Sequence, residues 1–180
     1  MKRTLFLLFL VGALLSAQSQ QVESQISTSG PYEKHNEIKI NGLYFVLGAF
    51  DLIYERNLSE ESSLGISVFL PFDENVRDEI QYYISPYYRF FFGKKYAAGF
   101  FVEGFGMLNS YEEDITSLFS NGDGEENYVT DFALGFGLGG KWVTKKGFMA
   151  EVSWGIGRNL FDAGNLDIVL KYSISLGYRF

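Results

Sequence analysis

The chain of 180 residues contains no cysteine, only three prolines and a single histidine. The absence of cysteine excludes disulfide bonds, thiol chemistry, cysteine-ligated zinc, iron–sulfur clusters and a lipid-bearing N-terminal cysteine. These absences give no reason to expect a cofactor. Glycine (20 residues) and aromatic residues (18%) are plentiful instead. This composition favours an all-β fold.

Long apolar runs are also missing, except at the N-terminus, so a bundle of membrane-spanning helices is excluded. Residues 1–19 have the pattern of a secretory signal peptide, with Lys2 and Arg3, an uncharged apolar stretch from Leu5 to Leu15, and a small-x-small site at Ala17-Gln18-Ser19. We therefore expect residues 1–19 to be removed. Residues 20–37 are polar and predict a mobile periplasmic tail, and residues 38–180 predict the folded domain.

Positive charge is scarce. Without Lys2 and Arg3 the chain has 13 basic and 22 acidic residues, a net charge of −9. Nucleic acid binding requires clustered Lys and Arg. Nucleic acid is therefore not an expected partner.

From residue 38 onward the dominant hydrophobic period is two, which predicts β-strands. In the last segment the apolar residues Leu170, Tyr172, Ile174, Leu176, Tyr178 and Phe180 alternate with Lys171, Ser173, Ser175, Gly177 and Arg179. Similar segments lie at about 38–47, 50–55, 63–70, 80–92, 96–103, 131–141 and 148–157. The glycines at 135, 137 and 139 fall within one of these segments, which favours close packing in a narrow barrel over a phosphate-binding loop.

The connections alternate in length. Those at 58–62, 93–95 and 144–147 are short, and those at 71–79, 109–127 and 158–165 are longer. This alternation predicts an antiparallel up-and-down transmembrane β-barrel with short periplasmic turns. Eight strands, with a tight outer turn near Gly48-Ala49, place both termini in the periplasm. One long strand over 38–57 would give seven strands and place the N-terminus outside.

The polar face decides which way the apolar face points. It carries five basic and five acidic residues, spaced by small residues: Lys39, Asp51, Glu55, Arg89, Glu103, Asp131, Lys141, Glu151, Lys171 and Arg179. This set is too sparse for the exterior of a soluble lipid-binding barrel, and it suits a narrow interior with paired charges. A closed barrel with an apolar exterior also leaves no backbone group unpaired in lipid. We therefore predict these ten charges to lie inside.

The last strand resembles the C-terminal signature of bacterial outer-membrane β-barrels, and with the signal segment and eight strands the chain resembles small barrels of the OmpA/OmpX type. The resemblance implies an outer-membrane location and contact with outer-membrane lipids, in a monomer. It also implies that the barrel-assembly machinery reads Tyr172, Ile174, Leu176, Tyr178 and Phe180. Such barrels serve as adhesins, anchors, small channels and enzymes, so the resemblance does not fix the activity or an extracellular partner.

Three functions therefore stay open: a structural or surface-interaction barrel with a plugged interior, a small-solute channel, and a lipid-modifying enzyme. Enzymatic chemistry is disfavoured because the single histidine, His35, lies in the predicted tail. No other histidine is available to act as the base of a Ser-His-Asp triad. Glu103, Asp131 and Glu151 are more easily explained as partners of Arg89, Lys141 and Lys171 than as a catalytic pair. We expect no catalytic residues.

One long connection is strongly acidic. Its residues Asp123, Glu125 and Glu126 supply oxygen atoms of the kind that bind Ca²⁺ or Mg²⁺. Their spacing does not complete an EF-hand, so a solvated acidic loop without metal is the expected state.

Overall fold

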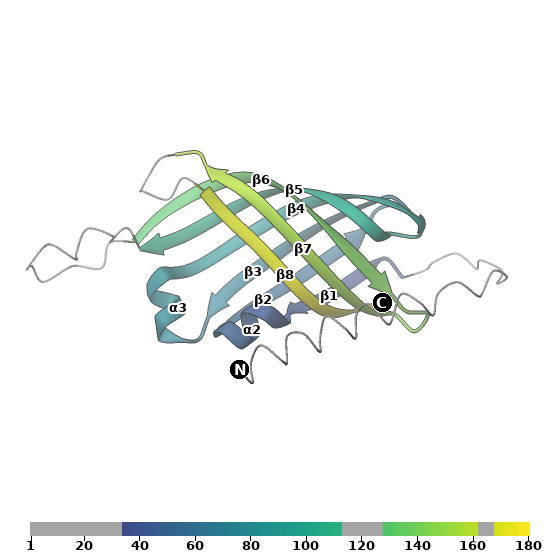
Figure 1. Ribbon diagram of the computed structural model, residues 1–180, viewed down its shortest axis with the longest axis horizontal. Coiled ribbons are helices and arrows are strands. Elements are labelled where there is room, and N and C mark those ends of the chain that lie inside the picture. The colour runs from purple at the N-terminus through teal and green to yellow at the C-terminus, as the bar shows by residue number, and fades with distance from the viewer. Residues whose placement is uncertain (1–33, 113–127, 162–167) are drawn as a thin grey trace, which may run out of the picture. The chain divides into compact units, whose positions relative to one another are not determined.

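The strands with alternating apolar and polar side chains form a closed barrel in the computed structural model. The structure describes residues 34–112, 128–161 and 168–180. Eight antiparallel strands of these residues pair in sequence order, and β1 pairs with β8 to close the sheet (Figure 1). The fold class, an eight-stranded up-and-down barrel, is as the sequence predicts. No helix in the described part of the chain is long and apolar enough to cross a membrane.

The elements are β1 (Asn36–Asn41), α2 (Gly42–Leu47), β2 (Ala49–Asn57), β3 (Ser62–Pro71), α3 (Glu74–Glu79), β4 (Ile80–Lys95), β5 (Ala98–Glu112), β6 (Tyr128–Val143), β7 (Phe148–Asn159) and β8 (Ile168–Arg179). We call the end that holds Asn36 and Phe180 the terminal end. Their backbones exchange hydrogen bonds of 3.1 and 2.8 Å there. The opposite end, where β3 connects to β4 through α3, is the loop end.

The predicted first strand is wrong in its second half. β1 ends at Asn41, and residues 42–47 form α2 in place of a strand and a tight turn. Asn41 caps the helix by accepting a hydrogen bond from Leu43 N, and Gly48 ends it in the left-handed conformation with φ of 104°. The segment from Leu43 to Leu47 is apolar at successive positions, so it lacks the alternation that holds a strand with one face in lipid and one inside.

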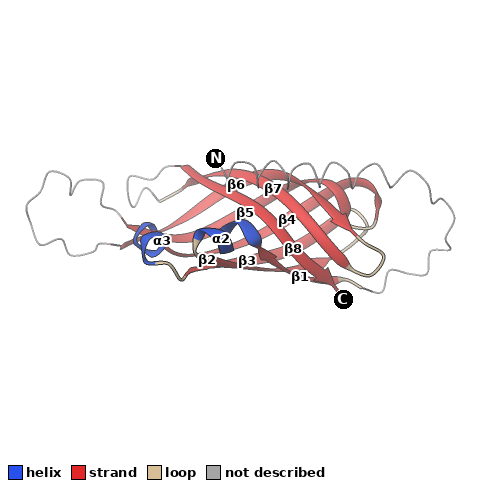
Figure 2. Cartoon of the chain, turned by 60° about the horizontal axis from the view of Figure 1, so that its bottom comes forward, coloured by secondary structure: helices blue, strands red, loops and turns tan. Residues whose placement is uncertain are grey.

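α2 fills the wall of the barrel where β1 is too short. β1 pairs with β8 only up to Asn41 opposite Ser175, so the stretch from Ile168 to Ile174 has no strand partner on this side among the described residues. Figure 2 shows α2 beside β8 and β2 at this position. The Asn41 side chain donates to Tyr172 O over 2.9 Å and accepts from Ile174 N over 3.2 Å. This one side chain thereby bonds two of the backbone groups of β8 that face α2.

The connection over 71–79, predicted as a loop, contains the short helix α3. Asp73 caps it, and its Oδ1 accepts hydrogen bonds from Asn75 N and Asn75 Nδ2 at 3.0 and 2.9 Å. These bonds stabilise the ionised carboxylate and lower the pKa of Asp73 below its ordinary value.

The exterior is apolar and the interior polar along β8. Leu170, Tyr172, Ile174, Leu176 and Tyr178 are exposed, whereas Lys171, Ser173, Ser175 and Arg179 are buried. The other strands repeat this division, with outward residues such as Leu134, Phe136 and Leu138 on β6. The apolar belt encircles the barrel, which is the surface that a bilayer requires.

The glycines of β6 make room for aromatic rings inside the barrel. A Cβ atom at Gly135 would lie 2.3 Å from Phe105 Cζ, and one at Gly139 would lie 2.5 Å from Phe101 Cζ. Any larger residue at these positions would displace the rings. The glycine run therefore serves interior packing.

Candidate functional site in the barrel interior

A connected set of nine buried ionisable residues fills the barrel nearer the terminal end. We call it the ion network; it consists of Glu37, Lys39, Glu55, Arg89, Glu103, Lys141, Glu151, Lys171 and Arg179. Seven of the eight strands contribute, because each of them places at least one ionisable side chain at an inward position. The set has five cations and four carboxylates.

The network is continuous from Arg179 to Lys171. Glu37 accepts from Arg179 Nε at 2.8 Å and from Lys141 Nζ at 2.9 Å. Lys141 also bonds Glu55, which in turn lies 2.6 Å from Lys39 Nζ. The remaining links join Lys39 to Glu151 (2.8 Å), Arg89 to Glu151 (2.7 Å), Arg89 to Glu103 (2.7 Å) and Lys171 to Glu103 (3.0 Å).

Arg89 is the hub of the network. Its guanidinium bonds carboxylates from three strands, Glu55 on β2, Glu103 on β5 and Glu151 on β7. The same group lies between the rings of Tyr87 and Phe101, 4.3 and 4.2 Å from their centroids. A guanidinium suits this position because it stays charged, donates in a planar fork and stacks on aromatic faces.

Glu37 is the network residue that the sequence analysis missed, because it assigned residues 20–37 to a mobile tail. β1 begins at Asn36, and the Glu37 side chain is fully buried between Lys141 and Arg179. The sequence did contain an indication of this position. Glu37 lies two residues before Lys39, so in a strand its side chain points to the same inward face. The predicted signal peptide and the rest of the predicted tail, up to residue 33, lie outside the described residues.

All ten predicted interior charges are buried, but they do not all join the network. Asp51 accepts a hydrogen bond from Asn41 Nδ2 over 3.0 Å. Asp131 Oδ1 accepts from the backbone N–H groups of Phe132 and Phe161. These two aspartates lie toward the loop end, at the start of β2 and of β6.

His35 is not in an exposed tail as expected. It lies half-buried at the terminal end, where its Nδ1 and the Tyr96 hydroxyl share a 2.9 Å hydrogen bond. It is therefore remote from the carboxylates of the network's centre and forms no triad with them. Within the described residues no group of three His, Asp or Glu side chains has metal-site geometry. The candidate cation ligands Asp123, Glu125 and Glu126 lie outside these residues.

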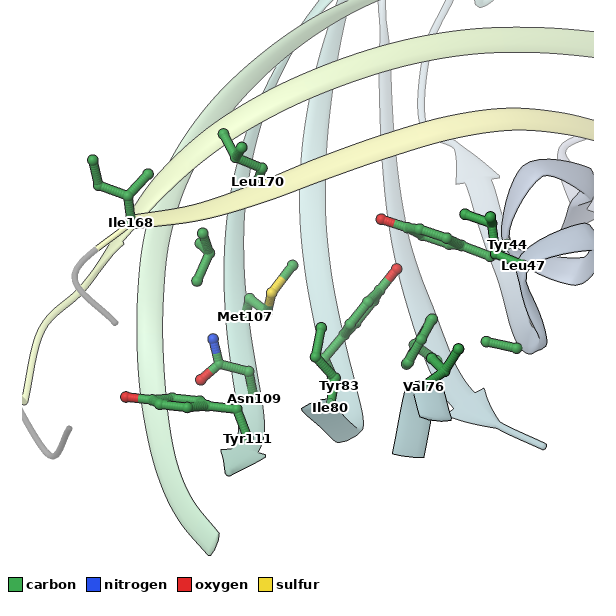
Figure 3. A pocket seen from close by; sticks show the side chains of 13 residues that line it. Tyr44, Leu47, Val76, Ile80, Tyr83, Met107, Asn109, Tyr111, Ile168 and Leu170 are labelled. Carbon is green, nitrogen blue, oxygen red and sulfur yellow. The ribbon is translucent and has the colours of Figure 1, made fainter. Parts of the chain in front are cut away.

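The loop end of the interior has a different character. A cavity of about 470 Å³ lies there, and the thirteen described residues that line it have no formal charge (Figure 3). Aromatic and aliphatic side chains form most of its wall, including Phe69, Met107 and Val169. The hydroxyl groups of Tyr44 and Tyr83 point toward one another at its edge. The sequence analysis did not predict this cavity, although Phe69 and Tyr83 are large residues at inward positions.

A closed antiparallel barrel with an apolar belt and buried charges is a transmembrane barrel of the bacterial outer-membrane type, since only such a closed sheet satisfies every backbone group in lipid. The chain belongs to a family described as "Protein of unknown function (DUF3575)", whose model matches residues 5–175. No curated protein matches the chain.

Two solved structures are similar. The N-terminal β-barrel domain of Pseudomonas aeruginosa OprF is 15% identical, with a TM-score of 0.59 over 82% of this chain and 98% of that chain. Yersinia pestis outer membrane protein Ail in a phospholipid bilayer nanodisc is 17% identical, with a TM-score of 0.39 over 82% of this chain and 100% of that chain. The likeness to the OprF domain confirms the predicted OmpA/OmpX-type fold.

Proposed function

We propose that the protein is a structural or surface-interaction barrel of the outer membrane, whose interior the ion network closes to solutes. The observation that carries this proposal is the position of Arg89, which extends from β4 to carboxylates on β2, β5 and β7. An eight-stranded barrel has an interior just wide enough for side chains to fill or to hold one small ligand. The rings of Tyr87 and Phe101 also lie within 4.3 Å of the guanidinium carbon and add bulk to this cross-section.

The orientation follows from the connections. The terminal end has the short turns between β2 and β3, β4 and β5, and β6 and β7, and the loop end has the longer connections. Outer-membrane barrels keep short turns in the periplasm and long loops outside. In this proposal both termini lie in the periplasm, and the loop end, with its acidic connection, faces the environment of the cell.

The C-terminal strand would guide assembly. Tyr172, Ile174, Leu176, Tyr178 and Phe180 all lie on its exposed, lipid-facing side. They are accessible to an assembly factor before the barrel closes. Deleting Phe180 should slow accumulation of folded barrel in cells, and unchanged accumulation would count against this part of the proposal.

Planar-bilayer recordings test the closed interior. Wild-type protein should show no stable conductance steps, and Arg89→Ala should introduce them because it removes the hub from the cross-section. Arg56→Ala, an exposed position near the terminal end, is the matched control and should remain silent. Stable steps in the wild type would instead support a small-solute channel, the alternative that a charged interior also allows.

A catalytic role is not part of the proposal. The single histidine is engaged with Tyr96, and each network carboxylate faces a cation. Incubating the folded barrel with outer-membrane lipids should leave those lipids chemically unchanged by mass spectrometry. A modified lipid would contradict this view.

A further inference from the structure

The cavity at the loop end has a composition opposite to that of the ion network. None of the thirteen described residues that line it carries a charge, and its volume of about 470 Å³ lies within the range of small-molecule sites, roughly 300–1,000 Å³. The Phe69 and Tyr83 rings stack at 4.8 Å and form part of its wall. An apolar cavity of this size accommodates an apolar ligand better than water, because water there finds few hydrogen-bond partners.

The cavity is lined by residues on both faces of β8. Val169 on β8 points inward and is 6% exposed, whereas its neighbours Ile168 and Leu170 point outward and are 55% and 47% exposed. All three line the same cavity. A cavity bounded by both faces of one strand reaches the outer surface beside that strand.

The local fold explains this side opening. Among the residues that the structure describes, β8 has no strand partner from Ile168 to Ile174 on the side toward α2, and the side chains of Asn41 and Tyr44 bond its backbone at Tyr172 and Ile174. Leu47, at the end of α2, lines the cavity from across this gap and is itself more than half exposed. The opening is therefore flanked by apolar, outward-facing residues that belong to the lipid-facing belt.

We propose that this cavity binds one alkyl chain of a membrane lipid, which enters from the bilayer between α2 and β8. The chain would move from one apolar environment to another without crossing water, and the uncharged lining disfavours an ionic headgroup inside. Asn109, buried in the cavity wall, keeps its Oδ1 without a hydrogen-bond partner among the described residues. This oxygen can accept a hydrogen bond from a hydroxyl group on the chain. The proposal rests on the membrane location, and it does not depend on whether the barrel conducts ions.

Photolabelling tests the proposal on the intact barrel. The chain is folded into phosphatidylcholine vesicles that contain a phospholipid with a diazirine near the end of one acyl chain, irradiated, and mapped by peptide mass spectrometry. We expect label on inward-facing Met107, Tyr83 or Val169, in addition to outward residues. A second arm adds a free diazirine fatty acid from water to unlabelled vesicles. Interior label from the free acid alone would contradict entry from the bilayer.

A matched pair of variants separates cavity binding from general exposure. Val169→Trp fills the cavity, and Val152→Trp places the same side chain on the lipid-facing side of β7. Label on Met107 should be lost in the first and kept in the second. Should Val169→Trp fail to fold, Met107→Phe serves as a smaller filling, with Tyr83 and Val169 as the labelled positions.

The experiment distinguishes a failure of the alkyl-chain proposal from a failure of the membrane location. Circular dichroism and heat-dependent gel mobility first establish that the barrel has folded into the vesicles. A chain that stays outside them would contradict the membrane location. A folded wild-type barrel labelled only on outward residues would overturn the alkyl-chain site.

Discussion

Arg89 and Glu103 lie directly opposite each other on β4 and β5, and the guanidinium Nε donates to Glu103 Oε2 over 2.7 Å. This pair anchors one side of the ion network. From it, the second arm of the guanidinium extends across the interior to Glu55 and Glu151. One cross-strand neighbour therefore orients the side chain that connects distant strands.

Removing this hub should destabilise the barrel. Arg89→Ala removes one of the cations that Glu55, Glu103 and Glu151 each contact, and breaking a buried ion pair typically costs about 3–5 kcal/mol. Urea unfolding in phospholipid vesicles, followed by tryptophan fluorescence, measures the loss. Arg56→Ala is the control, and it should change the free energy of unfolding by less than about 0.5 kcal/mol because Arg56 is exposed. Equal unfolding midpoints for the two variants would contradict the role of Arg89.

A charge placed in the apolar belt should be costly for a different reason. Ile174 lies at the middle of β8 and points outward. Ile174→Arg should cost about 2–4 kcal/mol, the range for arginine at the bilayer midplane. Leu58→Arg, in a turn at the terminal end, should cost only about 0–1 kcal/mol because the charge reaches the interface. The same unfolding assay compares them, and similar costs would count against a lipid-facing belt.

Replacing Asn41 should destabilise the barrel strongly for so small a side chain. Its side chain accepts from Leu43 N and Ile174 N and donates to Asp51 and Tyr172 O. Asn41→Ala should cost about 1–3 kcal/mol for each buried group left unpaired, and it should speed amide exchange at Ile174. Asn36→Ala, which loses only an exposed bond from Tyr54, is the control. Unchanged exchange at Ile174 would show that Asn41 does not hold this edge.

α3 should become less stable at low pH. The pKa of Asp73 is lowered by hydrogen bonds from Asn75, so the ionised carboxylate stabilises the helix above the ordinary aspartate pKa. This contribution should disappear as the pH falls through the lowered pKa. NMR shifts of α3 residues over an acid titration measure it, and Asp73→Asn should abolish the transition at Asp73. A transition that persists in Asp73→Asn would implicate another group.

Alternation in the sequence was sufficient to predict the closed barrel, because a strand with one face in lipid must repeat with period two. The same rule placed Lys171 and Arg179 inside and Ile174 outside. It could not find α2, since the run from Leu43 to Leu47 breaks the alternation without itself indicating a helix. The choice depends on Asn41 bonding β8, a contact between residues more than 130 positions apart.

The network and the cavity were predictable to different degrees. Parity identified the inward charges, but their partners depend on the register and tilt of the strands, which the sequence does not state. Lys39 and Glu151, for example, meet across 112 positions. The cavity arises from the shortness of β1 and from inward Phe69 and Met107, so it could be seen only once the wall was known.

The most direct test of the account measures which solvent each face meets. Because the chain has no cysteine, single-cysteine variants at Leu138, Val152 and Ile174 can each carry one nitroxide label in vesicles. Electron paramagnetic resonance should show high accessibility to oxygen and low accessibility to a water-soluble nickel complex at all three positions. High accessibility to the nickel complex at these positions would place the apolar face in water or in the interior and would contradict the account.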